Sequence, residues 1–385
     1  MKQLNVVLAG LGFGAAFAPI YAEHPDVASF GIFDPSHELA KNAAARLGNV
    51  KVYSSFEEVL KDPNVDAVHL VSPIPCHTEQ TLAVLEAGKH CACTVPMAVN
   101  IDDLKAIAEA VKKSGKNYCV METALYTTHF FKAAEMLKNG EIGNIQFLRG
   151  AHYQDMEHWP DYWLGLPPLF YGTHAIAPLV MLADSPIVRV RGLGSGVMRK
   201  ELHARYGNPF PVETAQLEFA NGLKGEVTRS LFETAHDYTE QFILYGSKKT
   251  FEWQQIESEQ PVIHTLLPPR RDDQGNPLRG LPVTVERIST GNYHTLLPES
   301  IRRFTVKHED YDETNPQLSL DRDASGGHGG SHPHMVHEFI RSVIENRKSW
   351  VNEINGANIV AAGICAHESA IQGGKIIDIP GFGQS

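Results

Sequence analysis

The first third of the chain alternates short apolar runs with longer segments whose apolar positions repeat at helical spacing. The apolar runs are rich in β-branched residues and occupy residues 4–9, 29–33, 65–71, 90–93 and 117–121. The helical segments between them cover residues 36–47, 78–87 and 101–113. Because strands that alternate with helices pair in parallel, this pattern predicts an α/β fold with a doubly wound parallel sheet.

The pattern changes near residue 125. A helix is predicted at residues 129–137, and longer runs with alternating apolar and polar positions follow at residues 145–152, 216–219, 223–230 and 240–244. Such alternation predicts antiparallel strands with one covered face. We therefore expect two domains, residues 1–124 and residues 125–385, the second of the α+β type.

Two further segments complete the second domain. Residues 254–325 are rich in Pro, Asp, Arg and Gly and have little periodicity, which predicts a long insertion over the surface or near a site. Helical patterns at residues 333–346 and 355–372 close the chain, and these helices can pack back on the first domain.

Composition narrows the class of protein. With 385 residues, 43% apolar and 21% charged, the chain suits a soluble two-domain protein. Its net charge of −11 argues against a nucleic acid partner, and no apolar run is long enough to span a membrane. The N-terminus begins a strand almost at once, without the pattern of a secretion signal.

The five cysteines are odd in number and lie mostly in apolar runs, so buried free thiols and a cytoplasmic setting are expected. Cys91 and Cys93 have no partner pair at zinc-like spacing, which favours core packing over a metal site.

The first predicted strand is followed by a glycine-rich turn, Gly10-Leu11-Gly12-Phe13-Gly14, and then by a helix expected to start near Phe13. Gly10 permits a tight turn, Gly12 lets a pyrophosphate approach the backbone, and the helix offers it free N–H groups. Asp34 ends the second strand, where a carboxylate accepts hydrogen bonds from the adenosine ribose and repels a 2′-phosphate. The turn therefore predicts a dinucleotide site that prefers NAD to NADP.

Two further turns face the same edge of the predicted sheet. Ser72-Pro73 follows the strand at residues 65–71 and presents backbone to the cofactor, while His77 either caps the next helix or contacts substrate. Thr94-Val95-Pro96 follows the strand at residues 90–93. We expect Thr94 and Pro96 to border the cofactor.

These motifs resemble those of the Gfo/Idh/MocA oxidoreductases over the full length of the chain. The resemblance rests on Gly10-x-Gly12, Asp34, Ser72-Pro73 with His77, Gly88-Lys89-His90 and the Pro96 turn. It implies a Rossmann domain followed by a domain with an open, mostly antiparallel sheet, sugars or polyols as substrates, and a homo-oligomer, either a dimer or a tetramer. The family usually has Glu-Lys-Pro where this chain has Thr94-Val95-Pro96, so the usual catalytic lysine is missing.

Another base must then take the proton of the reacting hydroxyl. Tyr171 and His174 are three residues apart at the start of a predicted helix, in the position of the family's catalytic histidine motif, and a neutral imidazole is a suitable base. His174 can alternatively be a core residue. Glu122 and Tyr126 follow the strand at residues 117–121 and are expected beside the nicotinamide, Glu122 as a cofactor or substrate ligand and Tyr126 as a catalytic or an interdomain packing residue.

Polar and aromatic residues of the second domain have the makeup of a sugar cleft. Gln154 and Asp155 supply groups that bind hydroxyls, and Trp159 a ring that stacks on a sugar face, although the aromatic run at residues 159–163 can equally fill a core. The loop Gly326-Gly327-His328-Gly329-Gly330 brings backbone close to a ligand and places His328 for a substrate hydroxyl. A metal at His334 and His337 is disfavoured, because their spacing is i, i+3 and no acidic partner is evident beyond Glu338.

Within the family, the combination of a lysine-free Val-Pro turn, Tyr126, Tyr171, His174 and the His328 loop is most similar to the NAD-dependent glycosidases, among them α-N-acetylgalactosaminidases and sulfoquinovosidases. The resemblance implies oxidation of the sugar at C3, loss of the C2 proton to Tyr126 or Tyr171, elimination of the aglycone, addition of water and re-reduction, with His174 serving O3. The acetamido-sugar enzymes carry Glu-Val-Pro, from which Thr94 departs.

Two alternatives remain: an ordinary NAD-dependent sugar dehydrogenase or keto-sugar reductase, and a non-catalytic sugar or nucleotide sensor. An anionic sugar would require a cation, for which the candidates are Arg199, Lys200, Arg270 and Arg271.

Overall fold

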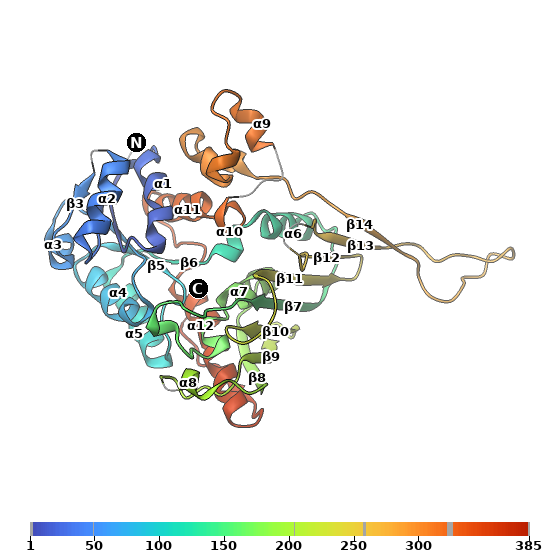
Figure 1. Cartoon of the computed structure of the whole chain (residues 1–385). Coiled ribbons are helices and arrows are strands. Elements are labelled where there is room, and N and C mark those ends of the chain that lie inside the picture. Colours follow the sequence, from blue (N-terminus) through green and yellow to red (C-terminus); the bar gives the residue numbers. More distant parts are fainter. Residues whose placement is uncertain (1–2, 49, 204, 257–258, 322–325, 384–385) are drawn as a thin grey trace.

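The N-terminal part of the molecule is a parallel sheet covered by helices on both faces (Figure 1). The computed structural model describes residues 3–48, 50–203, 205–256, 259–321 and 326–383. The sheet has the strand order β3-β2-β1-β4-β5-β6, and every pair in it is parallel. Its strands are β1 (Leu4–Ala9), β2 (Val27–Phe33), β3 (Lys51–Val52), β4 (Ala67–Leu70), β5 (His90–Thr94) and β6 (Tyr118–Met121). This confirms the predicted doubly wound α/β fold.

The helices of this part begin and end at residues with the expected capping chemistry. They are α1 (Ala18–Glu23), α2 (His37–Leu47), α3 (Phe56–Lys61), α4 (His77–Glu86) and α5 (Ile101–Ser114). The side chain of Ser36 accepts a hydrogen bond from the Leu39 N–H and that of Asn100 from the Asp103 N–H, while Gly115 ends α5 at φ 64°. These side chains satisfy backbone groups that the helix ends leave free.

The second part is built on a nine-stranded sheet of order β14-β13-β12-β11-β7-β10-β9-β8-β15. All neighbours are antiparallel except β7 and β10, so the sheet is mixed and mostly antiparallel, as predicted. Its strands are β7 (Ile145–Tyr153), β8 (Ile187–Ser195), β9 (Val212–Phe219), β10 (Lys224–Ser230), β11 (Thr239–Gly246), β12 (Lys249–Glu252), β13 (Val262–Leu266), β14 (Val283–Arg287) and β15 (Ile377–Asp378).

Two buried helices cover one face of this sheet at close range. They are α7 (Thr173–Ala183) and α12 (Glu353–Ile371), and most of their residues are buried. A Cβ atom on Gly150 of β7 would lie 2.2 Å from the Ala175 carbonyl oxygen, and one on Gly192 of β8 would lie 1.9 Å from that of Ala366. Glycine at these two positions therefore sets the distance between sheet and helices, and with it the position of the first turn of α7.

The core is continuous from one sheet to the other. α12 packs against α5 and β6, and a Cβ on Gly356 would meet Val120 at 2.4 Å. The helix α6 (Thr128–Lys138) packs against α7, and α11 (His332–Ile344) packs against α1. The remaining helices are short and lie in loops: α8 (Lys200–His203), α9 (Pro316–Leu320) and α10 (Gly327–Gly330). All five cysteines are free, and all but Cys76 are buried.

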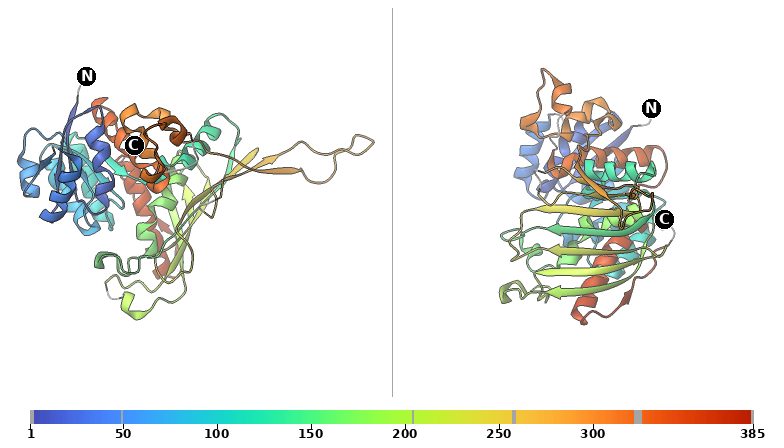
Figure 2. Two further views of the ribbon diagram at one scale, coloured as in Figure 1. Left: turned by 45° about the horizontal axis from the view of Figure 1, so that its top comes forward. Right: turned by 90° about the vertical axis from the view of Figure 1, so that its right-hand side faces the viewer.

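The segment 254–325 contains two strands that the sequence analysis did not predict. It contains β13 and β14, which extend the sheet as a hairpin and continue away from the body as a long arm (Figures 1 and 2). Prolines and charged residues interrupt the alternation of apolar and polar positions in this segment, so the two short strands could not be recognised from the sequence pattern. Among the described residues, the structure contains no helix that is both long and apolar enough to cross a bilayer.

Candidate functional site

The glycine turn after β1 has the geometry that a dinucleotide requires. Gly10 adopts φ 100°, and a Cβ there would lie 2.4 Å from the Val71 carbonyl oxygen, so the turn is tight and permits only glycine. A Cβ on Gly12 would meet nothing within 4 Å, which leaves open space at the backbone. The expected helix start is wrong: Phe13–Ala16 form a 3₁₀ turn, and α1 begins only at Ala18.

Asp34 lies directly after β2 and joins the turn. Its Oδ2 accepts a hydrogen bond from the Leu11 N–H at 2.7 Å and its Oδ1 one from the Ser36 N–H at 2.8 Å. Each carboxylate oxygen keeps a further lone pair for a ribose hydroxyl. The open backbone at Gly12 and the oriented carboxylate fit NAD, so Gly10, Gly12, Phe13, Gly14 and Asp34 are the residues that would hold it.

His77 connects the two other turns at this edge of the sheet. It is 1% exposed, and its Nδ1 lies 2.8 Å from the Pro96 oxygen and its Nε2 2.8 Å from the Ser72 oxygen. Both neighbours are acceptors, so the ring donates from both nitrogens as an imidazolium. Burial lowers the pKa of His77, but Cys93 and the two carbonyls outweigh burial and raise it to about 9. His77 therefore holds the turns together and does not face the cleft.

The side chains of the two turns are themselves engaged with protein. Ser72 Oγ donates to Gln80 Oε1 at 2.5 Å, and Thr94 Oγ1 donates to the Leu70 oxygen at 3.4 Å. The Val95-Pro96 bond is cis. What Ser72, Pro73, Thr94 and Pro96 offer a cofactor is thus their backbone.

Glu122, His174 and Tyr171 form a buried chain of hydrogen bonds. Glu122 follows β6 and His174 lies in the first turn of α7, and the two are 1% and 2% exposed. His174 Nδ1 donates to Glu122 Oε1, and His174 Nε2 lies 3.1 Å from the Tyr171 hydroxyl. Burial lowers the pKa of His174, but the carboxylates of Glu122 and Glu240 outweigh it and raise the pKa. The carboxylate thus orients the ring and stabilises its protonated form, as in a triad.

A second carboxylate and histidine face this chain from the other side. Glu240 of β11 accepts a hydrogen bond from the Tyr238 hydroxyl at 2.5 Å, and His328 Nδ1 lies 3.3 Å from the same oxygen. The rings of His328 and His174 are 6.1 Å apart. Burial raises the pKa of Glu240, but His174 and His328 outweigh it and lower the pKa to about 2. His328 has φ 48°, a left-handed conformation that commits the loop to presenting this ring.

His152 of β7 lies between the two groups. Its ring is 5.0 Å from that of His174 and 5.2 Å from that of Tyr238. The side chain is fully buried, and neither ring nitrogen has a hydrogen-bond partner. Burial and the nearby Arg229 hold the pKa of His152 well below its usual value. Buried polar groups normally have hydrogen-bond partners, so the two unsatisfied nitrogens of this neutral ring are unusual and mark the site as a candidate for function.

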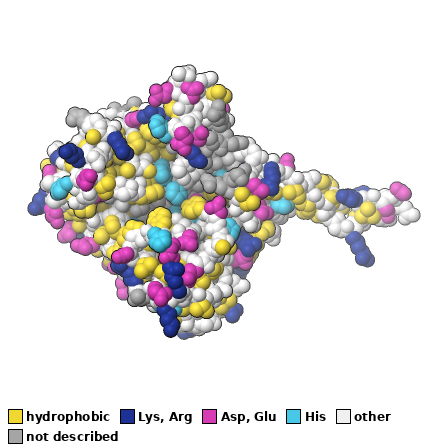
Figure 3. Space-filling view, in the orientation of Figure 1, with side chains coloured by type: hydrophobic (Ala, Val, Ile, Leu, Met, Phe, Trp, Pro, Cys, Tyr) yellow, Lys and Arg dark blue, Asp and Glu magenta, His cyan; other side chains and the backbone are white. Residues whose placement is uncertain are grey.

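The second of these groups borders a cleft of about 670 Å³ between the two domains, whereas Glu122, Tyr171 and His174 are not among its described lining residues and lie behind Glu240 and His328. Phe13 and Ala16 line it from the first domain, and Gln154, Trp159, Tyr238, Glu240, Trp253 and His328 are among those that line it from the second. Histidine side chains gather at this junction in the space-filling view (Figure 3). The described lining residues include the carboxylates of Glu240 and Glu259 but no Lys or Arg.

The predicted substrate-binding residues of the second domain are only partly at the cleft. Gln154 Oε1 accepts a hydrogen bond from Arg229 at 2.9 Å, and Trp159 is 48% exposed at the rim of the cleft. Asp155 is exposed and bonds the Glu157 N–H, away from the cleft lining. Arg199 is paired with Glu157, and Arg270 and Arg271 lie on the arm, so these three candidate cations are outside the cleft.

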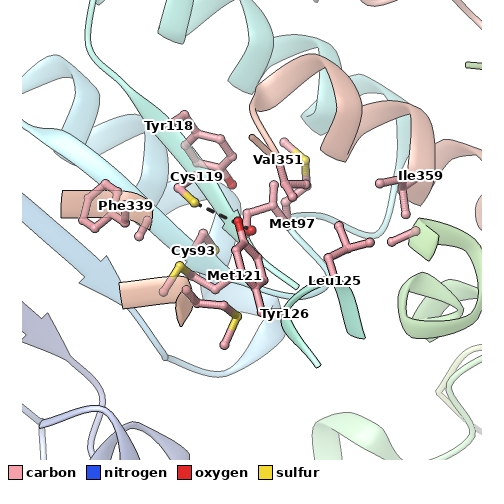
Figure 4. Close-up of a cluster of buried hydrophobic side chains, with 14 of the residues drawn as sticks. Cys93, Met97, Tyr118, Cys119, Met121, Leu125, Tyr126, Phe339, Val351 and Ile359 are labelled. Carbon is pink, nitrogen blue, oxygen red and sulfur yellow. Dashed lines mark hydrogen bonds between the residues drawn. The ribbon is translucent and has the colours of Figure 1, made fainter. Parts of the chain in front are cut away.

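Tyr126 lies in the core and not at the cleft. It packs with Cys119, Met97 and Val351 among buried side chains, and its ring lies against Trp350 at 5.6 Å (Figure 4). The residue is 4% exposed, and its hydroxyl has no partner. The 3₁₀ turn Thr123–Tyr126 after β6 directs Glu122 toward the site and Tyr126 away from it.

The sequence did not point to Glu240, Tyr238 or Arg229. Tyr238 directly precedes β11 and Glu240 is its second residue, so the two polar groups stand two positions apart at the start of a strand that is otherwise rich in apolar residues, which is the signal that could have revealed them. The described residues contain no group of three or more His, Cys, Asp or Glu placed to hold a metal ion.

Arg229 holds the backbone of the site residues in place through hydrogen bonds. It is fully buried in β10 and donates to the carbonyl oxygens of Tyr171 at 3.0 Å, His152 at 3.2 Å and Ser230 at 2.7 Å, with its guanidinium 5.3 Å from the Tyr171 ring centre. Burial lowers the pKa of Arg229 to about 10. Its rigid fork thus fixes the segments that carry Tyr171 and His152.

We expect Arg229→Met to destabilise the protein by about 2–4 kcal/mol, because it leaves several buried acceptors unpaired. Urea unfolding measures the change. Arg149→Met on neighbouring β7 is the matched control, since Arg149 makes an exposed ion pair with Glu226 at 2.9 Å and its loss is expected to cost below about 1 kcal/mol. Equal stabilities of the two variants would contradict the supporting role of Arg229.

Comparison with known proteins places this site in context. Residues 4–122 match the model of an oxidoreductase family with an NAD-binding Rossmann fold, and residues 130–252 match that of the GFO/IDH/MocA C-terminal domain. A levoglucosan dehydrogenase of Pseudarthrobacter phenanthrenivorans is 32% identical over 170 residues, which are 42% of this chain and 44% of that protein. A glycosyl hydrolase family 109 protein of Saccharopolyspora erythraea is 24% identical over 263 residues, 60% of this chain and 56% of that protein. The chain thus spans about half the length of these two relatives.

Two further relatives extend the comparison. A myo-inositol 2-dehydrogenase of Thermotoga maritima is 26% identical over 253 residues, 64% of this chain and 73% of that protein. Among solved structures, a levoglucosan dehydrogenase in complex with NADH and levoglucosan superposes with a TM-score of 0.76 at 20% identity, covering 98% of this chain and all of that one. At this identity the superposition establishes a common fold.

Proposed function

The chain belongs to the Gfo/Idh/MocA family of NAD-binding oxidoreductases, and from this premise we propose that it hydrolyses glycosides by transient oxidation of the sugar. The observation that carries the proposal is the proximity of two separate carboxylate and histidine groups: Glu240 and His328 line the cleft, and Glu122 with His174 lies behind them, with the two histidine rings 6.1 Å apart. Oxidation of a hydroxyl needs one proton acceptor, whereas elimination of an aglycone needs a second centre for proton transfer.

The cofactor would be held by the Gly10–Gly14 turn, Asp34 and the backbone of Ser72 and Pro73. Bound NAD would supply reversible hydride acceptance at the sugar carbon that is oxidised, and the carbonyl at that carbon would make the neighbouring C–H bond acidic.

The first group serves the hydroxyl that is oxidised. The Tyr171 hydroxyl accepts the proton of the sugar hydroxyl and passes its own proton to His174 Nε2, 3.1 Å away. Glu122 holds the opposite nitrogen as a donor and stabilises the imidazolium that forms. The hydrogen-bonded residues Tyr171, His174 and Glu122 thus take over the proton transfer of the usual lysine, at whose position this protein has Val95.

The second group serves the elimination. Glu240 is ionised and accepts from His328 Nδ1, which leaves Nε2 free to take the proton from the acidified carbon. The same proton is then available to the glycosidic oxygen as the bond between that oxygen and the sugar breaks. Water adds by the reverse sequence, so net hydrolysis consumes no cofactor.

The charge of the cleft favours a substrate without negative charge. Its described lining holds Glu240 and Glu259 and no cation, and Arg199, Arg270 and Arg271 lie elsewhere. The carboxylates in the cleft lining would repel a sulfonate or carboxylate on the sugar. A neutral sugar or an amino sugar fits, with Trp159 at the rim to stack on its apolar face.

An NAD-dependent sugar dehydrogenase is the second candidate. It is supported by the relatives named as levoglucosan and inositol dehydrogenases and by the simpler chemistry, since oxidation of a hydroxyl requires only one proton acceptor, for which the Tyr171–His174–Glu122 hydrogen bonds are the candidate.

An assay with aryl glycosides separates the two candidates. Purified protein is incubated with neutral aryl glycosides without added cofactor, while aglycone release and the absorbance of reduced nicotinamide are followed together. Release of aglycone over many turnovers without net NADH supports the glycosidase. Stoichiometric NADH from a free sugar, with no aglycone release, would overturn it in favour of the dehydrogenase.

A further inference from the structure

The hairpin β13–β14 and the chain that joins its strands form an arm, residues 262–287. Figure 1 and the left view of Figure 2 show that the arm leaves the edge of the nine-stranded sheet and extends clear of the body. From Leu266 to Leu281 all residues are exposed, and so are all five residues of β14. No other described part of the chain covers this segment.

The arm carries a concentration of apolar side chains. Leu266 and Val283 are a cross-strand pair with 43% and 51% exposure, and Val285 is 64% exposed. Leu267, Leu278 and Leu281 continue the series toward the tip. Six of the nineteen exposed large hydrophobic residues in the described chain thus fall within 20 consecutive positions. Apolar surface gathered in this way marks an interaction site.

The root of the arm is part of the cleft wall. The Ile288 N–H donates to the Pro261 oxygen at 3.0 Å, and Arg287 pairs with Glu259 at 3.1 Å. Glu259, Pro261 and Ile288 all line the cleft. Whatever holds the arm therefore also holds one wall of the site.

We propose that the arm docks on a second copy of this chain. The 22 residues from Leu266 to Arg287 match the 20–30 residues that one side of a stable interface contributes. Charge supports the same partner: the arm has four Arg against two Asp and one Glu, a net charge of +1, so the rest of a chain with net charge −11 carries −12. A weakly basic, apolar arm is attracted to an acidic body of this kind.

Two-fold symmetry makes the contact reciprocal. Each arm then covers a surface of the other copy, so that one set of apolar residues is buried twice. Docking also restrains residues 259–261 and 287–288 at the root, so the second copy fixes the cleft wall of the first. The arm is in this sense a link between assembly and site.

The test removes the arm without disturbing the sheet. Leu267 and Pro282 are hydrogen-bonded across the hairpin, so residues 268–281 can be replaced by Asn-Gly, which closes a two-residue turn. Sedimentation equilibrium of the full-length protein is expected to give a multiple of the monomer mass. The shortened protein is expected to dissociate, with at least a tenfold weaker association, while keeping its melting cooperativity.

Point variants provide a second measurement that does not depend on the new turn. Val283→Lys and Val285→Lys place charges on the apolar stripe and are expected to weaken association, whereas Val197→Lys, at an 89% exposed valine off the arm, is the matched control and should not. A full-length protein that is monomeric at micromolar concentrations would overturn the proposal. So would a shortened protein with unchanged mass, because another surface would then hold the oligomer.

Discussion

Replacement of His174 by alanine is expected to lower kcat by about 10³-fold while the affinity for NAD stays within about threefold of the wild type. The ring links the Glu122 carboxylate to the Tyr171 hydroxyl, and it lies at the start of α7, away from the glycine turn and Asp34. Turnover of the best substrate and NAD binding by fluorescence titration are the two measurements.

The pH dependence of kcat/KM tests the same group. His174 must be neutral to accept a proton, and the carboxylates of Glu122 and Glu240 raise its pKa above the ordinary value despite its burial. Activity is therefore expected to rise with pH through this raised pKa and to be low where the imidazolium persists. Tyr171→Phe should keep this acid limb, since it removes the hydroxyl and leaves the ring, although its rate falls.

A matched control is available in the second domain. His236 is exposed and stacks on Tyr153 at 4.3 Å, outside the cleft lining, so His236→Ala should change kcat by less than about twofold. Turnover of His174→Ala within threefold of the wild type would exclude His174 from the chemistry, and so would a pH profile without an acid limb.

The sequence predicted the elements whose signals are local. The glycine turn and the apolar periodicity of the strands each act within a few residues, and the structure has them where they were expected. The contact of Tyr171 with His174 is local as well, because the two residues are three positions apart at a helix start.

Groups brought together by the second sheet could not be predicted in the same way. Glu240 and His328 are 88 positions apart, and Glu240 meets His174 only because α7 packs closely against β7 and β11. Tyr126 shows the opposite case, since its position after β6 suggested the cleft, but the turn at residues 123–126 rotates it into the core. A shift of one or two residues at the end of a strand determines whether a side chain faces the cleft or the core. The pattern of apolar and polar positions does not predict strand ends that accurately.

The Thr94-Val95-Pro96 turn gains a physical explanation from these contacts. The backbone of this turn is fixed by the His77 imidazolium, which bridges Pro96 to Ser72, so the turn keeps its shape without a charged side chain of its own. In the proposed mechanism, the proton transfer that a lysine would provide is assigned instead to residues held by α7 and β11. The proposal requires two such centres because protons move at two sugar positions, and a single lysine would serve only one of them.

Glu240→Gln is the change expected to distinguish hydrolysis from simple oxidation. The amide keeps the shape of the carboxylate and still accepts from Tyr238, but it no longer holds a negative charge beside His328. If His328 takes the carbon-bound proton, aglycone release and exchange of that proton with deuterated water should both fall by about 10²–10³-fold. Oxidation of the sugar hydroxyl, measured as NADH formed in a single turnover, should fall by less than about tenfold because the Tyr171–His174–Glu122 chain is intact.

The same variant carries an internal check on the electrostatics. Because the Glu240 carboxylate is one of the causes that raise the pKa of His174, its neutralisation should move the acid limb of the pH profile to lower pH. Glu259→Gln is the control, since Glu259 also lines the cleft but is paired with Arg287, and it should leave both rate and profile nearly unchanged. Equal losses of NADH formation and aglycone release in Glu240→Gln would mean that both carboxylates act on one step, and unchanged aglycone release would remove the second group from catalysis. Only a selective loss of proton exchange and cleavage agrees with two centres that act in sequence on one sugar.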